Sequence, residues 1–144
     1  MNTNNDFRIC PDTGLKWHRP AETLIKLNAV AAVVFLLVGG ILGLGVGLTR
    51  WPEVHLLGPD TFYQVLTGHG INVLIFWIIF FEMAVLHFAS STLLGCRMAM
   101  PKVGMAAFLL MVLGALLNNY AVMVVGNSSV MMTSYVPMPA DTLF

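Results

Sequence analysis

Residues 61–81 read TFYQVLTGHGINVLIFWIIFF, and this stretch decides the fold because it contains no Asp, Glu, Lys or Arg. A helix that crosses a bilayer needs about 20 largely apolar residues. Two further stretches, residues 27–49 and residues 103–140, are equally free of charged side chains. The chain of 144 residues is 58% hydrophobic and only 10% charged, with a mean hydropathy of +0.82. We therefore predict an all-α integral membrane protein with three transmembrane helices.

The charged and turn-forming residues divide the chain into seven segments. Asp60, after Gly58 and Pro59, is expected to cap the second helix through its carboxylate. The polar opening lacks the basic-then-apolar pattern of a cleaved signal, so the first helix is expected to be retained. The predicted segments are a cytoplasmic N-terminal tail (1–22), transmembrane helix 1 (23–48), an outer loop (49–59), transmembrane helix 2 (60–94), a cytoplasmic loop (95–102), transmembrane helix 3 (103–126) and an outer C-terminal segment (127–144).

The basic residues predict the orientation in the membrane. Loops rich in Lys and Arg stay in the cytoplasm. Six of the seven basic residues share one side, and only Arg50 lies on the other, which we take as the outside. We expect the membrane to be a prokaryotic plasma membrane. Cys10 and Cys96 both fall on the reducing side and should be free thiols. The seven basic and seven acidic residues cancel, so no charge favours nucleic acid as a partner. The six basic residues on the cytoplasmic side are Arg8, Lys16, Arg19, Lys26, Arg97 and Lys102.

His69 is the leading candidate for a site inside the membrane. Taking Trp77 as the middle of the second helix, His69 lies about 12 Å toward the outer end, still within the hydrocarbon. Gly68 and Gly70 flank it and leave room for a large flat ligand, as expected if the imidazole coordinates a metal or a haem iron. The alternative is a histidine bonded to a carbonyl of a neighbouring helix, with the two glycines serving helix packing.

Two further ionisable residues lie on the same helix. Glu82 is about 7 Å on the other side of Trp77. A carboxyl at that depth is ionised only if it is paired and is otherwise neutral, which suits a possible proton relay. The alternative is a hydrogen bond that fixes one helix to the next. His87 lies about 27 Å along the axis from His69, so the two cannot share one metal, and we place His87 near the cytoplasmic interface.

Small and amide side chains predict how the helices contact one another. Gly39, Gly43 and Gly47 are spaced four apart and form a smooth stripe for close helix approach. Asn118 and Asn119 lie in the outer half of the third helix and are expected to form hydrogen bonds across helices.

Three motifs carry a resemblance to a known family. The sequence YQVLTGHG at residues 63–70 resembles the pattern at the head of the second helix of subunit I of the haem-copper oxidases. The sequence GCRMAMPK at residues 95–102 resembles the family's loop before its third helix, and TSYVP at residues 133–137 is similar to the outer segment after that helix. The motifs occur in the family's order and cover nearly all of the chain after residue 23.

The resemblance implies a role for His69 as one axial ligand of the low-spin haem, with Gly68 and Gly70 beside that cofactor. Electrons pass from this haem to a second haem and copper, where the family reduces dioxygen to water and translocates protons. The implied donor is cytochrome c or a quinol, and the implied partners include the electron-accepting subunit II.

The chain also departs from the family pattern. Arg97 stands where the common oxidase type has an aspartate, and Gly104 with Met105 stand where it has asparagines, so the proton path that opens there is expected to be absent. Met132 replaces a frequent tryptophan. Met131 and Met132 also raise the possibility of copper binding, although methionine is more often apolar filler in membrane helices.

The length of the chain is its largest departure from the family pattern. The family's second axial histidine and its copper ligands lie on later helices, so we expect three spans that are an incomplete part of a larger helical bundle and not catalytic alone. The rest of the subunit, with the second haem and the copper, is then expected on a separate chain, whether this is a natural split or a truncation. The open alternatives are a piece of a haem-copper nitric oxide reductase and a cofactor-free three-helix accessory subunit.

Overall fold

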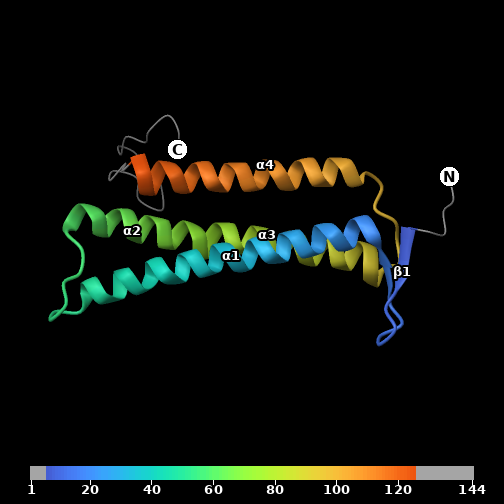
Figure 1. The fold of residues 1–144 in the computed structure, drawn as a ribbon, viewed down its shortest axis with the longest axis horizontal. Helices are drawn as coiled ribbons and strands as arrows, with labels where there is room; N and C mark the ends of the chain where they lie inside the picture. The colour runs from blue at the N-terminus through green and yellow to red at the C-terminus, as the bar shows by residue number, and fades with distance from the viewer. Residues whose placement is uncertain (1–5, 126–144) are drawn as a thin grey trace.

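The computed structural model describes residues 6–125 and contains three long helical rods that lie side by side (Figure 1). The rods are Arg19–Arg50, Pro59–Leu93 and Pro101–Val125, and each is long and apolar enough to cross a membrane. The prediction of a helical membrane protein with three spans is therefore confirmed.

The first rod is a single helix, α1 (Arg19–Arg50), which begins four residues before the predicted start of the first span. Its first turn contains Pro20, whose fixed φ suits that position. The helix ends at Arg50, because Trp51 directly precedes Pro52, whose ring disfavours a helical backbone at the residue before it. The polar first turn belongs to the helix because backbone hydrogen bonding, and not hydropathy, sets where a helix begins.

The second rod alternates between α- and π-helical turns. It consists of α2 (Pro59–Ile71), the π segment η2 (Asn72–Phe76), α3 (Trp77–His87) and the π segment η3 (Phe88–Leu93). The prediction that Asp60 caps this rod is wrong. Pro59 already occupies the first helical position, so Gly58 becomes the cap residue and its carbonyl accepts from the Phe62 N–H at 2.8 Å. Asp60 lies inside the first turn, where its negative charge still favours the positive end of the helix.

The third rod consists of α4 (Pro101–Tyr120) and the π segment η4 (Ala121–Val125). It begins two residues before the predicted span because Pro101 again fits the first turn. The TSYVP motif and the candidate copper ligands Met131 and Met132 lie outside the described residues.

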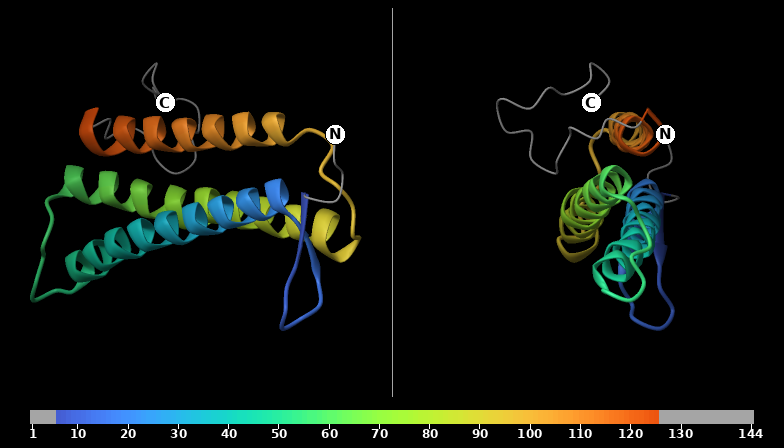
Figure 2. Two further views of the ribbon diagram at one scale, coloured as in Figure 1. Left: turned by 45° about the vertical axis from the view of Figure 1, so that its right-hand side comes forward. Right: turned by 90° about the vertical axis from the view of Figure 1, so that its left-hand side faces the viewer.

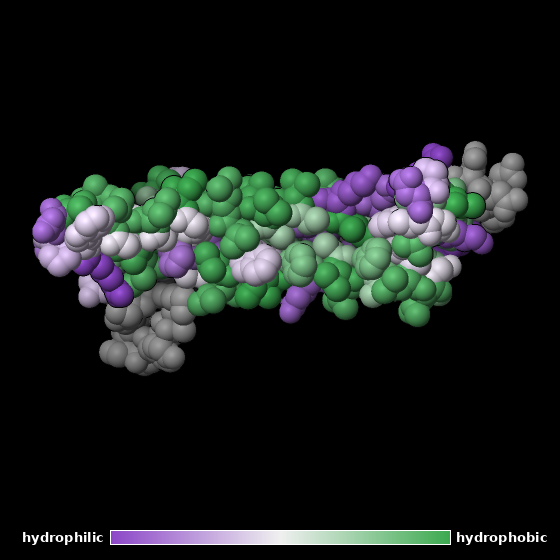
Figure 3. All heavy atoms as spheres, turned by 90° about the horizontal axis from the view of Figure 1, so that it is seen from below, coloured by the Kyte–Doolittle hydropathy of each residue, from purple (hydrophilic) through white to green (hydrophobic). Residues whose placement is uncertain are grey.

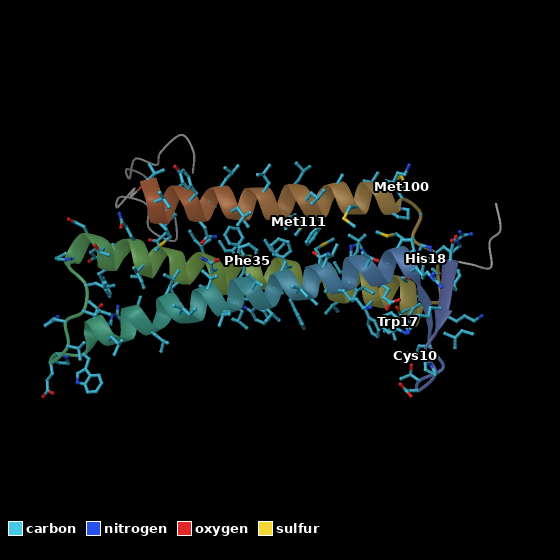
Figure 4. The ribbon with its side chains drawn as sticks, in the orientation of Figure 1. Cys10, Trp17, His18, Phe35, Met100 and Met111 are labelled. Carbon is cyan, nitrogen blue, oxygen red and sulfur yellow. The ribbon has the colours of Figure 1, made fainter. Side chains whose placement is uncertain are left out.

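Aromatic and small side chains hold the rods together at mid-length. Phe35 of α1 stacks on Phe80 of α3 with ring centroids 5.3 Å apart and an 8° angle between the planes, and Phe80 meets the edge of Phe108 at 6.0 Å. Ala32 and Ala115 complete the buried cluster. Figure 4 shows Phe35 and Met111 in the space between α4 and the other two rods. This cluster fixes the relative height of the rods and hence of any site between them.

The outer surface of the rods is apolar along most of its length. The end-on view in Figure 2 shows the three rods at the corners of a triangle, and Figure 3 shows hydrophobic side chains covering the middle of the molecule. Leu37, Leu44 and Leu110 are 62%, 68% and 69% exposed. Such a surface needs lipid or further helices around it, because water would solvate it poorly.

A short β-hairpin that the sequence did not predict precedes α1. The strands β1 (Phe7–Ile9) and β2 (Lys16–His18) pair antiparallel, with Phe7 opposite His18 (Figure 2). The loop between them closes through Gly14, whose φ of +68° is a conformation that glycine adopts without strain.

Charged groups tie the hairpin to the start of α1. Arg8 donates to both carboxylate oxygens of Glu22, at 2.7 and 3.2 Å, and Lys26 donates to the same carboxylate at 2.7 Å. The carboxylate is largely buried and holds the pKa of Arg8 above its usual range.

The hairpin also holds the loop that leads into α4. Arg97 of that loop forms an ion pair with Asp6, and the Met98 N–H donates to Nδ1 of the buried His18 at 3.4 Å. Trp17 packs on Phe88 with ring centroids 5.6 Å apart (Figure 4). Cys10 and Cys96, near this end of the molecule, are free thiols, as predicted.

We expect the hairpin to release as the pH falls below about 6.5, the ordinary pKa of histidine. Burial lowers the pKa of His18, Arg97 lowers it further, and Asp6 opposes the shift. His18 of the released hairpin therefore takes up a proton at a higher pH than His18 of the docked hairpin. The docked state is fully stable above about pH 6.5, and it loses stability as the pH falls from there toward the lower pKa of His18 in the docked form. Backbone hydrogen exchange of residues 7–18 at about pH 7.5 and about pH 5.5, corrected for intrinsic rates, measures this. His18→Phe should remove the difference; an equal loss of protection in that variant contradicts the prediction.

Candidate functional site

The imidazole of His69 lies between α2 and α1, in the half of α2 that leads into η2. Its Nδ1 is 2.8 Å from the carbonyl oxygen of Gly39 on α1. A carbonyl only accepts, so Nδ1 carries the proton and Nε2 presents its lone pair. Nε2 has no hydrogen-bond partner within residues 6–125, and the side chain is only partly buried. His69 therefore has one oriented ring nitrogen, Nε2, that no described residue engages.

Glycines on α1 make this close approach possible. A Cβ atom at Gly43 would lie 2.8 Å from Cε1 of His69 and 2.9 Å from its Nδ1. A Cβ atom at Gly39 would lie 2.5 Å from the Val73 side chain. The predicted glycine stripe is therefore confirmed at these two positions, whereas Gly47 faces open space with nothing within 4 Å.

The two glycines that flank His69 lie in the packed part of the site. The space beside Gly68 is taken by Met123 and Leu42, whose nearest atoms would be 2.9 and 3.0 Å from an added Cβ atom. Gly70 is buried. Gly68 thus lets η4 and α1 come close to α2, and contact of either glycine with a cofactor stays a prediction.

An amide pair lies three residues beyond His69. Asn72, which is fully buried, donates from Nδ2 to Oδ1 of Asn119 at 2.7 Å, and Asn119 donates back to Oδ1 of Asn72 at 3.3 Å. The predicted hydrogen bond across helices is confirmed for Asn119. It is not found for Asn118, whose Oδ1 is buried without a partner among the described residues. Asn72 was missed, although an amide inside an apolar run is itself a signal.

The last residue of α1, Arg50, places a guanidinium at the same end of the rods. Arg50 lies over the ring of Phe62, with its guanidinium carbon 5.7 Å from the ring centroid. Arg50, His55 and Tyr63 line a pocket of about 450 Å³ beside the loop between α1 and α2. Such a pocket suits an anionic group, because guanidinium and imidazole donate hydrogen bonds to carboxylates.

Glu82 and His87 are not brought to His69. Glu82 is exposed on α3 between apolar neighbours such as Phe81 and Val85, and no described side chain forms a hydrogen bond or ion pair with it. His87 lines a pocket of about 310 Å³ with Cys96 and Arg97, near the loop that enters α4. Within residues 6–125, no three His, Cys, Asp or Glu side chains gather in a way that could hold a metal ion.

The comparison with protein families agrees with the three motifs. The sequence model of the family described as cytochrome c and quinol oxidase polypeptide I matches residues 23–144. The chain belongs to this family. The matched residues include His69 and all three spans except the first four residues of α1, and the N-terminal hairpin precedes them. Neither the comparison with curated proteins nor that with solved structures returns a match.

Membership in the oxidase subunit I family gives the fold and the broad chemistry. The three rods correspond to the N-terminal part of a haem-copper oxidoreductase subunit, and their apolar surface is that of a membrane protein. The family binds haems and copper in complexes with other subunits, so the chemistry to explain is electron transfer in the membrane.

Proposed function

We propose that this chain supplies one axial ligand, Nε2 of His69, to the low-spin haem of a haem-copper terminal oxidase. The observation that carries the proposal is the oriented imidazole, with Nδ1 held by the Gly39 carbonyl at 2.8 Å and Nε2 without a described partner. Metal-bound histidines commonly donate their other ring N–H to a backbone carbonyl or carboxylate, which fixes both tautomer and ring orientation. The residues present therefore fit a haem iron.

The bond to Gly39 also supports the competing hypothesis of a cofactor-free accessory subunit. A histidine that only joins two helices could make the same bond. The two hypotheses differ over Nε2, because a purely structural histidine should also pair that nitrogen, since an unpaired buried nitrogen is costly. The partial exposure of His69 and the family match both support the ligand role.

A bis-histidine haem supplies reversible one-electron transfer without release of the electron to solvent. Its second histidine, the second haem and the copper then belong to the rest of the subunit. The remaining partners in this proposal are subunit II and a donor, cytochrome c or quinol. The pocket lined by Arg50 and His55 is suited to the carboxylates of the low-spin haem.

The proposed membrane arrangement follows from the charge distribution. The contacts of Arg8, Lys26 and Arg97 place these three basic residues at one end of the rods, opposite to Arg50. We assign the first end to the cytoplasm by the positive-inside rule. His69 then lies toward the outer side of the membrane and Glu82 toward the inner side.

Counting haems tests the proposal. Gentle dissociation of this chain from the purified complex should remove about one low-spin haem for each chain released, because one of its two axial ligands leaves. Pyridine haemochrome analysis of the remaining complex measures the loss. The chain is an accessory subunit if the haem content per complex is unchanged after its release.

A further inference from the structure

We propose that the Asn72–Asn119 amide pair positions His69, so that α4 influences the orientation of the haem ligand through Asn72. The inference rests on the proposed function. The amide groups form a closed set of hydrogen bonds in which each amide nitrogen has two acceptors. Asn72 Nδ2 donates to the Gly68 carbonyl and to Asn119 Oδ1, both at 2.7 Å. Asn119 Nδ2 donates to the Ala115 carbonyl at 2.9 Å and to Asn72 Oδ1 at 3.3 Å.

The pair lies where the second rod changes its winding. Asn72 begins the π segment η2, in which the Trp77 N–H donates to the Asn72 carbonyl, five residues back. Single π turns inside α-helices are frequent at functional sites. The Gly68 carbonyl accepts from both the backbone N–H and the side chain of Asn72. The amide pair therefore stabilises the turn that directly follows the His69 segment.

Gly39 connects this turn to the imidazole. A Cβ atom at Gly39 would lie 3.2 Å from Cβ of Asn72, and the carbonyl of the same glycine holds Nδ1 of His69. Asn72 and His69 thus contact one residue of α1, while Asn119 holds Asn72 from the side of α4. If the pair is lost, η2 is free to relax toward an ordinary α turn, which rotates the flanking residues relative to Gly39.

Asn119→Ala tests whether the amide pair positions His69, and Asn118→Ala is its matched control. Both variants remove an amide from neighbouring positions of α4, but only Asn119 bonds to Asn72. In assembled oxidase we expect Asn119→Ala to retain the low-spin haem. Its electron paramagnetic resonance g values and midpoint potential should shift, whereas Asn118→Ala should resemble the wild type. Hydrogen exchange of residues 68–76 should become about tenfold faster, the effect of losing one well-buried hydrogen bond.

The outcomes separate a positioning role from a purely structural one. Lower thermal stability with unchanged g values and potential overturns the inference, because the pair then only joins two helices. If Asn119→Ala does not assemble, Asn119→Ser keeps one hydrogen-bonding group and is read by the same measurements. Failure of the proposed function is distinguishable, since the low-spin haem would then also survive removal of His69 itself.

Discussion

His69→Ala is expected to abolish the low-spin haem absorption bands of the assembled oxidase and to slow turnover more than about a hundredfold. The variant removes the imidazole whose Nδ1 is held by the Gly39 carbonyl and whose Nε2 no described residue engages. If His69 holds the haem, its loss would leave the iron short of one ligand and change the spin state, which reduced-minus-oxidised spectra would detect directly.

Two controls make this result specific. His87→Ala removes an imidazole from the same rod at a site away from His69 and should leave the bands intact. Gly43→Ala places a methyl group 2.8 Å from Cε1 of His69 and should perturb the bands, whereas Gly47→Ala enters open space and should not. Low-spin bands that survive His69→Ala unchanged would refute the ligand assignment.

The three spans were predictable because their cause is local composition. Charge-free stretches such as residues 61–81 need no knowledge of the fold to be read as spans, and Pro101 marks a helix start on its own. The exact ends were less predictable. The polar first turn of α1 contains Glu22, which is paired with Arg8 and Lys26, and Arg8 lies outside the helix.

The hairpin and the π turns could not be predicted because they depend on distant contacts. Asp6 and Arg97 are 91 positions apart, and no local pattern reveals their ion pair. The turn at Asn72 likewise depends on Asn119, 47 positions away. Propensity describes a segment by itself, whereas these features exist only after the rods have packed.

The sequence proposes the candidate residues of the site, but their contacts could not be predicted from it. Glycines around His69 indicated a close approach, yet Gly68 turned out to face Met123 and Leu42, and Gly43 lies against the ring. Spacing along one helix shows which residues share a face. It cannot show which neighbouring helix that face meets.

Glu82→Gln is expected to slow turnover at least about tenfold while the amount of assembled complex stays near that of the wild type, since a glutamine cannot carry a proton. The structure places Glu82 on the surface of the rods among apolar side chains, without a described partner. A carboxyl is costly against lipid, so this face must meet protein or a water-filled path in the complete oxidase. Turnover and haem-normalised yield of the purified complex measure the two effects separately.

The same variant distinguishes a relay from a hydrogen bond that merely joins helices. Glu82→Asp keeps a titratable carboxyl and should retain most of the turnover, with an altered pH profile, whereas Glu82→Gln keeps the shape and loses the acid. A helix-joining hydrogen bond predicts the reverse, because glutamine still accepts at its carbonyl oxygen while the shorter aspartate loses reach. Normal turnover in Glu82→Gln, with loss of assembled complex in Glu82→Asp, would therefore exclude the relay, and parallel loss of assembled complex and activity in Glu82→Gln would count against it. Normal assembly with slow turnover would leave the carboxyl as a proton carrier on the face that α3 turns toward the rest of the subunit.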